Sequence, residues 1–169
     1  PVSPEEVVAV PLAAASHLKP TLGDAVERSY FLYVGALEPR KNLVALVEAW
    51  RGVAGVDLVL AGRPREGFEL PRFPGLRMLG EVAEEDLSGL YSGALAVVYP
   101  SLYEGFGLPI VEAMACGAPV LTGDNSCLPE AGGAGAIYVN SSSTESIAYG
   151  IMRLATDDTL RKQLRKAGL

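Results

Sequence analysis

Buried strands and amphipathic helices alternate along this chain, and that alternation restricts its fold more than any other feature. Residues 31–35 form a continuous apolar and aromatic run, which is typical of a strand buried on both faces. Residues 43–53 then place large apolar side chains three, four and seven positions apart, on one face of a helix. A second apolar run follows at 56–61. This strand–helix–strand order predicts a unit of a parallel sheet.

The same alternation continues to the end of the chain. About six strands separated by helices predict an α/β fold: a Rossmann-like, doubly wound, mostly parallel sheet with helices on both faces. Ligands of such sheets bind at the carboxyl ends of the strands, so the loops there hold the candidate site residues. We expect further strands at 77–79, 94–99, 119–122 and 136–139, and further helices at 84–92, 109–115, 144–155 and 157–167.

Composition excludes several classes of protein. The chain has 169 residues, 49% of them hydrophobic and 20% charged, which suits one globular domain with its own core. The net charge of −6 argues against a nucleic-acid partner, which usually meets a basic face. Cys116 and Cys127 fit neither a zinc spacing nor a disulfide framework, so we expect free thiols in a reducing cytoplasm. No apolar run approaches the ~18 residues of a membrane span.

Residues 1–29 differ from the remainder, and we expect them to be a linker or N-terminal extension of a domain at 30–169. Residues 7–12 are a candidate short strand that Pro11 stops. His17 is expected at the surface, because no acidic or nucleophilic residue accompanies it in the sequence. We expect no signal peptide and a cytoplasmic protein, with a peripheral membrane location open for the full-length protein.

The segment 101–112 holds the strongest candidates for ligand binding. Glu104 lies in a loop after a strand, and Glu112 lies one turn inside a helix that Pro109 begins. Their carboxylates suit sugar hydroxyls, and the start of the helix favours an anion such as phosphate. The alternative is that Glu112 only complements the helix dipole and Glu104 is a solvated loop residue. The two glycines between them allow close approach of a ligand, which favours binding.

A basic loop follows the first strand. Gly35 ends that strand, and Arg40 and Lys41 stand just before the next helix, for which Asn42 is the expected N-cap. An adjacent arginine and lysine suit a diphosphate, although a solvated basic loop explains the stretch equally well. The sequence contains no G-x-G-x-x-G, no Walker pattern, no Asp-x-Asp and no His/Cys/Asp cluster at metal spacing. We therefore predict neither a metal nor another cofactor.

The segments 35–42 and 104–120 resemble the C-terminal, donor-binding domain of the large retaining group 1 glycosyltransferases, family four, which have the GT-B fold. The resemblance covers about residues 30–169, and the segment that joins the two glutamates is its most specific part. It implies that the chain binds a nucleoside diphosphate sugar without a metal. Many members carry arginine where this chain has Ala36, so Arg40, Lys41 or another residue must supply the phosphate charge.

The resemblance also implies individual roles. Glu104 would contact hydroxyls of the transferred sugar, and Glu112 would hold the ribose hydroxyls. Arg40 and Lys41 would neutralise the diphosphate leaving group. No role is assigned to Asn125 or Ser126. The other donor-binding residues that the resemblance implies are Gly35, then Gly105, Phe106, Gly107 and Leu108 around the sugar and phosphates, and Gly80, Glu81 and Val82 beside the base, bordered by Gly62 and Arg63.

The function implied is transfer of a hexose to an unknown acceptor with retention of anomeric configuration. The run 38–42 resembles mannosyltransferase-like members, which favours GDP-mannose over UDP-glucose. A GT-B enzyme also needs an acceptor-binding N-terminal domain as partner; we expect that domain to be absent, and the chain to bind donor without transferring sugar. The alternatives are a non-catalytic nucleotide-sugar-binding module, or another GT-B-fold enzyme such as a sugar-nucleotide epimerase.

Overall fold

A computed structural model describes residues 13–21 and 29–169, so the candidate strand at 7–12 lies outside the described residues. Six strands pair in parallel in the order β3-β2-β1-β4-β5-β6, which confirms the predicted doubly wound sheet. The strands are β1 (Tyr30–Val34), β2 (Asp57–Ala61), β3 (Leu76–Gly80), β4 (Ala96–Tyr99), β5 (Val120–Gly123) and β6 (Ala136–Val139).

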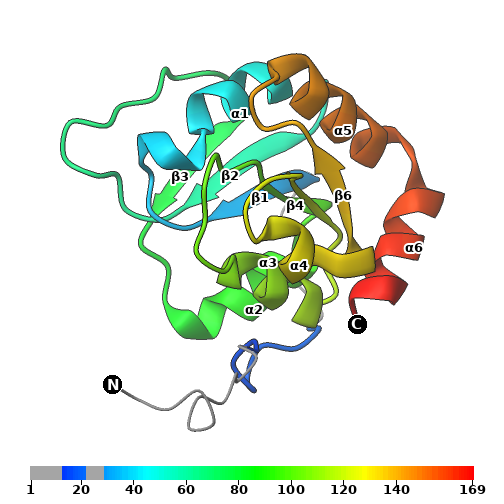
Figure 1. The fold of residues 1–169 in the computed structure, drawn as a ribbon. Coiled ribbons are helices and arrows are strands. Elements are labelled where there is room, and N and C mark those ends of the chain that lie inside the picture. The colour runs from blue at the N-terminus through cyan, green and yellow to red at the C-terminus, as the bar shows by residue number, and fades with distance from the viewer. Residues whose placement is uncertain (1–12, 22–28) are drawn as a thin grey trace, which may run out of the picture.

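Helices cover both faces of this sheet. The pair α1 and α5 packs together on one face, and α2, α3 and α4 lie on the other (Figure 1). Near β6, α6 packs against η3 and α3. The helices are η2 (Pro39–Lys41), α1 (Leu43–Trp50), α2 (Glu84–Gly93), α3 (Leu108–Ala115), α4 (Leu128–Gly132), η3 (Gly133–Gly135), α5 (Thr144–Thr156) and α6 (Asp158–Gly168).

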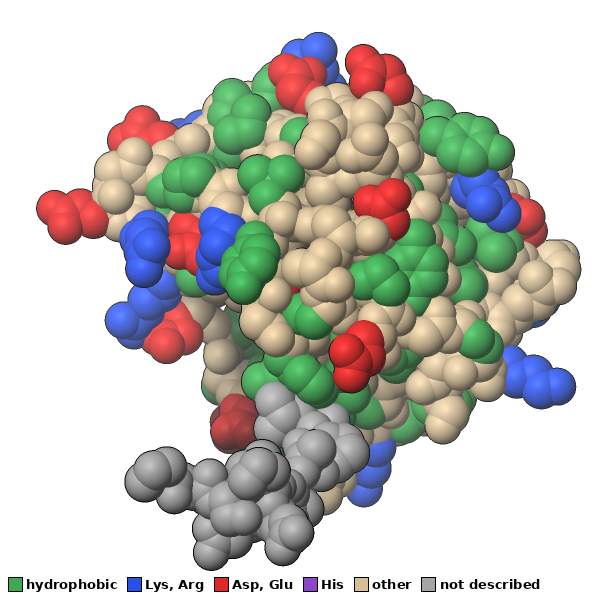
Figure 2. All heavy atoms as spheres, viewed as in Figure 1, with side chains coloured by type: hydrophobic (Ala, Val, Ile, Leu, Met, Phe, Trp, Pro, Cys, Tyr) green, Lys and Arg blue, Asp and Glu red, His purple; other side chains and the backbone are tan. Residues whose placement is uncertain are grey.

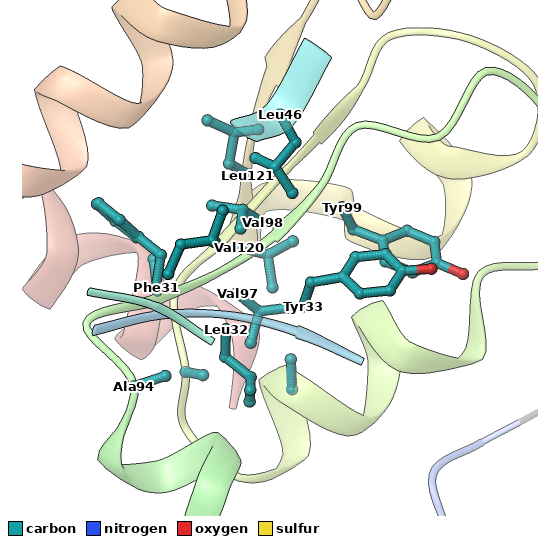
Figure 3. Packing of buried hydrophobic residues seen from close by; sticks show 14 of the residues in the cluster. Phe31, Leu32, Tyr33, Leu46, Ala94, Val97, Val98, Tyr99, Val120 and Leu121 are labelled. Atoms are coloured by element: carbon teal, nitrogen blue, oxygen red, sulfur yellow. The ribbon is translucent and has the colours of Figure 1, made fainter. Parts of the chain in front are cut away.

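The core forms around the central strands, because only these have neighbours on both edges and helices on both faces. Phe31, Leu32 and Tyr33 of β1 are fully buried, as the continuous apolar run predicts. The ring of Tyr33 stacks on that of Tyr99 at the end of β4, with centroids 5.5 Å apart (Figure 3). By contrast, the side chain of Met78 in the edge strand β3 is 49% exposed. The two stacked tyrosines therefore end the core beside the loops that follow β1 and β4.

Several predicted boundaries shift for local reasons. Helix α1 ends at Trp50 instead of residue 53, since Gly52 disfavours helix and the chain turns there. Asn42 is the N-cap residue, as predicted, but it is left-handed at φ 61° and its side chain makes no cap bond. Its amide donates instead to the carbonyl oxygens of Pro100 and Ser141. Helix α4, only five residues long, was not predicted.

The strand order reverses between β1 and β4, because β2 follows on one side of β1 and β4 lies on the other. The helices that follow these two strands, α1 and α3, therefore lie on opposite faces of the sheet (Figure 1), and in doubly wound folds this is where a ligand crevice forms at the carboxyl edge. Both strongest sequence segments, 35–42 and 101–112, follow these two strands. The fold thus brings the predicted site to one place.

Candidate functional site

The loops after β1 and β4 are joined directly to each other. The amide of Leu102 donates to the carbonyl oxygen of Arg40 at 3.0 Å, and Arg40 Nη1 donates to the carbonyl oxygen of Tyr103 at 2.8 Å. The side-chain amide of Asn42 links the same loops by donating to the carbonyl oxygen of Pro100. These bonds fix the position of Glu104, the next residue in the second loop.

Glu104 is the centre of a buried ionic cluster. Lys41 Nζ lies 2.6 Å from Glu104 Oε1, and Arg40 Nη1 lies 3.0 Å from Oε2. Lys41 also donates to the Tyr99 hydroxyl at 2.7 Å, and Arg40 reaches Glu38 at 2.7 Å. The side chains of Glu104, Lys41 and Glu38 are each less than a tenth exposed. The solvated-loop alternative for Glu104 and Lys41 is therefore wrong.

This cluster keeps Glu104 ionised. Burial alone would raise its pKa, but the hydrogen bond and the charge of Lys41 hold the pKa of Glu104 below its ordinary value. Burial, and then the charge of Glu104, raise the pKa of Tyr99 well above its ordinary value, so this phenol stays neutral. The site therefore presents a fixed carboxylate whose oxygens accept hydrogen bonds.

Glu112 has a different partner. It is the fifth of the eight residues of α3, is half-buried, and accepts a 2.8 Å hydrogen bond from the hydroxyl of Tyr91 in α2. Tyr91 is fully buried, and burial followed by the charge of Glu112 raises the pKa of its phenol above the ordinary value. Tyr91 is thus a neutral donor that holds one oxygen of Glu112 in place.

Both glutamates open into one hollow, which we call the Glu104 hollow, with a volume of about 390 Å³. The N-terminus of α3 lies in its wall, where Gly107 adopts a left-handed φ of 91° that only glycine takes readily. A carboxylate pair, one lysine and a helix start therefore face a shared cavity. Its lining residues are Gly35, Lys41, Tyr99, Glu104, Phe106, Gly107, Leu108, Pro109 and Glu112.

A second hollow of about 290 Å³ adjoins the first, because Gly35 lines both. We call it the Glu81 hollow. Arg63 and Glu81 form an ion pair at its surface, and both side chains are mostly exposed. Gly62 is required here, since a Cβ atom would lie 1.9 Å from the carbonyl oxygen of Gly35. The lining residues are Val34, Gly35, Ala36, Ala61, Gly62, Arg63, Glu81, Val82 and Leu87.

A third hollow, of about 340 Å³, lies at the opposite edge of the sheet, where β2 and β3 begin. Trp50, Asp57 and Phe73 are among its lining residues. No predicted site residue borders it. Because ligands of doubly wound sheets bind at the carboxyl ends of strands, the candidate site is the joined pair of hollows at the other edge.

Most of the predicted site residues come together, but three line neither hollow. Arg40 hydrogen-bonds to Glu104 but lines neither hollow. Gly105 follows Glu104 in the same loop and also lines neither hollow. The carbonyl oxygen of Gly80 accepts a 2.7 Å hydrogen bond from the amide of Gly62, which lines the Glu81 hollow.

His17 lies outside the candidate site and is partly exposed, in line with the predicted surface position. It has an acidic neighbour that the sequence did not indicate, because Glu84 Oε1 lies 3.2 Å from His17 Nε2.

Sequence reasoning missed the two tyrosines of the site and the support given by the loop at 123–127. Ser126 Oγ accepts from the amide of Glu104 at 3.3 Å, and Asn125 donates to the carbonyl oxygen of Leu102 at 2.6 Å. Tyr91 and Tyr99 carried one available signal, since a buried phenol requires a polar partner. Their partners are far away in sequence, so the spacing alone could not identify them.

The surface carries charged side chains of both signs (Figure 2). Basic and acidic side chains are interspersed on the face drawn in Figure 2. Within residues 13–21 and 29–169, no three His, Cys, Asp or Glu side chains gather as a metal site requires. Among the helices of that same part, none has the length and apolar character needed to cross a membrane.

Comparison with known families gives a match over nearly the whole chain. The family model described as Glycosyl transferases group 1 matches residues 17–169. O-antigen chain mannosyltransferase B of Escherichia coli is 35% identical over 162 residues, which cover 84% of this chain and 41% of that protein. O-antigen chain mannosyltransferase RfbU of Salmonella typhimurium is 35% identical over 130 residues, 71% of this chain and 36% of that protein. The chain thus spans well under half the length of these relatives.

Solved structures show the same architecture. Sucrose-phosphate synthase from Thermosynechococcus elongatus superposes with a TM-score of 0.75 and 26% identity, over 92% of this chain and 45% of that one. The Anabaena protein HepE, in complex with UDP-glucose, superposes with a TM-score of 0.73 and 22% identity, over 83% of this chain and 43% of that one. Each match covers less than half of the solved chain.

Proposed function

Because the chain belongs to the glycosyl transferases group 1 family, we propose that it is the donor-binding domain of a glycosyltransferase that uses a nucleoside diphosphate sugar. One observation carries the proposal: Glu104, Glu112 and Lys41 open into a single hollow at the carboxyl edge of the sheet. A second hollow shares Gly35 with it, so the two parts of an extended ligand could occupy neighbouring hollows.

The proposed binding mode follows the chemistry of each wall. Glu104, ionised and fixed, accepts hydrogen bonds from hydroxyls of the sugar. Glu112, held at one oxygen by Tyr91, accepts from the ribose hydroxyls with the other. The diphosphate lies between them, near Lys41 and the N-terminus of α3. The base then occupies the Glu81 hollow, beside Val82.

In the proposed reaction the bond between the anomeric carbon and the diphosphate oxygen breaks, and the electron pair leaves with that oxygen. Lys41 and the start of α3 stabilise the growing negative charge. The acceptor hydroxyl oxygen bonds to the anomeric carbon on the same face, and its proton passes to the departing phosphate. Configuration is then retained. Arg40 contributes by holding Glu104 in position, since its guanidinium donates hydrogen bonds to Glu104 and Glu38.

The sugar and the missing partner are part of the same proposal. Two relatives are named mannosyltransferases, which supports mannose as the transferred hexose. The chain spans 41% of the first of these, which supports an acceptor-binding domain in the remainder of the full-length protein. Residues 30–169 would then be the donor-binding domain, preceded by a linker. We place the protein in the cytoplasm, without a resident cofactor.

Calorimetry with GDP-mannose, UDP-glucose, GDP and UDP tests the proposal. We expect one nucleotide sugar to bind. Glu112→Ala should weaken the binding free energy of that nucleotide sugar by about 1–3 kcal/mol, as for lost hydrogen bonds to a charged group. The matched control is Glu48→Ala, because Glu48 is an exposed glutamate of α1 that lines neither hollow. Failure of every nucleotide to bind would end the proposal. Equal affinity of wild type and Glu112→Ala would remove the ribose assignment.

A further inference from the structure

The cations of the Glu104 hollow are already paired, and this leaves little charge for a diphosphate. Lys41 and Arg40 both contact Glu104, and Arg40 also contacts Glu38. Arg65 contacts Glu38 as well, so three cations share two carboxylates before any donor arrives. Glu104 and Glu38 are buried, and breaking a buried pair leaves an uncompensated charge. Lys41 therefore stays with Glu104 while it faces the diphosphate, and its charge is already shared, so a further cation would strengthen the phosphate site.

Arg63 is the cation placed to supply it. It follows β2, lines the Glu81 hollow beside Gly35 and Ala36, and so stands close to the junction of the two hollows. Its backbone is fixed, because its carbonyl oxygen accepts from the amide of Leu37 at 2.9 Å. Its side chain is 77% exposed and is bound to Glu81, which is itself 65% exposed. A firmly held backbone thus carries a long cationic side chain that is open to solvent.

The energies of the ion pairs decide which arginine can move. Exposed ion pairs contribute little to stability, because water screens them and long side chains lose entropy in making them. Giving up the Arg63–Glu81 pair therefore costs little. An arginine fork on phosphate oxygens in a partly enclosed hollow is stronger than such a pair, because two charge-assisted hydrogen bonds form in one plane. Exchange of Glu81 for phosphate is therefore favourable.

We infer that Arg63 leaves Glu81 when the donor binds and holds the diphosphate where the two hollows meet. This rests on the proposed function, since it names the residue that completes the phosphate site. Ala36, at the same junction, has no charge to offer. Arg63 would then act on phosphate and not on the base or the sugar, which separates it from Glu112 and Glu104.

The test compares affinities of a nucleoside, its monophosphate and its diphosphate for the chain, by calorimetry with the guanosine and uridine series. Arg63→Gln is expected to weaken the diphosphate about ten- to a hundredfold and the nucleoside less than about twofold. Glu81→Gln frees Arg63 and is expected to keep or tighten diphosphate binding. The control is Arg65→Gln, because Arg65 is 75% exposed in the same loop, pairs with Glu38 and lines neither hollow. It should change diphosphate affinity less than about threefold.

Three results would overturn the inference. Equal losses for nucleoside and diphosphate in Arg63→Gln would place Arg63 away from the phosphates. An equal effect of Arg65→Gln would show only a general loss of surface charge. Wild-type affinity in Arg63→Gln would exclude any contact. If the wild-type chain binds none of the nucleotides, both the proposed function and this inference are wrong. If the diphosphate binds wild type and Arg63→Gln equally well, only this inference is wrong. An unchanged melting temperature of Arg63→Gln shows that the variant folds.

Discussion

The two joined hollows are built in opposite ways. In the Glu104 hollow the side chains of Glu104 and Lys41 are buried and paired, and Arg40 contacts Glu104 from outside the hollow. In the Glu81 hollow a single arginine–glutamate pair stands mostly in solvent. Groups held in this way before a ligand arrives need no rearrangement at the moment of reaction. The contrast therefore separates a preorganised part of the site, where the bond to the sugar would break, from an adaptable part, where the base would bind.

The difference has a structural origin. The first hollow lies at the switch point, where the loops after β1 and β4 are tied by bonds from Asn42 and Arg40. The second lies between the ends of β1, β2 and β3, and β3 is an exposed edge strand. Loops at the centre of a sheet have neighbours on every side, whereas loops at its edge face water. Position in the strand order thus determines how firmly each charged side chain is held.

The largest effect is expected when the buried cluster loses its lysine. Lys41→Met leaves Glu104 buried with Arg40 alone, so the free energy of unfolding should fall by about 3 kcal/mol. Urea denaturation measures it. Arg63→Gln, the matching change in the Glu81 hollow, should lie within about 0.5 kcal/mol of wild type, as for an exposed residue.

A double variant shows whether the cause is the charge of Glu104. Lys41→Met with Glu104→Gln removes the charge that the single variant leaves poorly compensated. Its loss of stability should therefore be smaller than that of Lys41→Met alone. If Lys41→Met and Arg63→Gln cost the same, the buried and exposed pairs do not differ, and the contrast between the hollows is wrong.

Acid should affect the same cluster. The pKa of Glu104 is lower in the folded chain than its ordinary value of 4.5. The ionised form therefore stabilises the fold above that pH, and the contribution is lost as the pH falls below 4.5 through the lowered folded pKa. Glu104→Gln removes this contribution. Urea unfolding at a series of pH values should then show a shallower acid loss for Glu104→Gln than for wild type, and parallel curves would contradict it.

Much of the fold could be predicted from sequence, because a strand buried on both faces leaves a continuous apolar run. The run at 31–35 identified β1 to within one residue, and proline placed the start of α3. The five-residue α4 and the three-residue η3 are too short to show a helical periodicity. Asn42 occupies the predicted N-cap position, but its side-chain amide donates to carbonyl oxygens 58 and 99 residues away instead of capping α1. The local sequence around Asn42 could not predict those long-range hydrogen bonds.

The candidate site was predictable by residue type but not by pairing. The spacing placed Glu104 and Glu112 in one region, and both line one hollow. It could not show that Arg40 and Lys41 lie on Glu104, since this depends on how the loops after β1 and β4 meet. The switch point brings those loops together. Predicting which charged side chains pair therefore requires the strand order as well as the spacing of residues in the sequence.

The smallest effect is expected at Glu112, which belongs to the Glu104 hollow but is held by a neutral hydrogen bond. Tyr91→Phe removes the hydroxyl that lies 2.8 Å from Glu112 Oε2, and its ring keeps the packing. We expect affinity for a nucleoside diphosphate to fall by about 1 kcal/mol, roughly fivefold, because Glu112 is no longer aimed at the ribose. Calorimetry should show no such loss for a 2′,3′-dideoxynucleoside diphosphate, which lacks the hydroxyls that Glu112 would bind.

Tyr149→Phe is the matched control, since Tyr149 is 69% exposed on α5 and lines neither hollow. A loss of equal size for both nucleotides in Tyr91→Phe would mean that Tyr91 only supports the packing of α2 on α3. A loss confined to the ribonucleotide would show that a neutral donor can orient one carboxylate of the hollow while cations fix the other. Preorganisation of the Glu104 hollow would then rest on two kinds of hydrogen bond, one from a cation and one from a neutral hydroxyl.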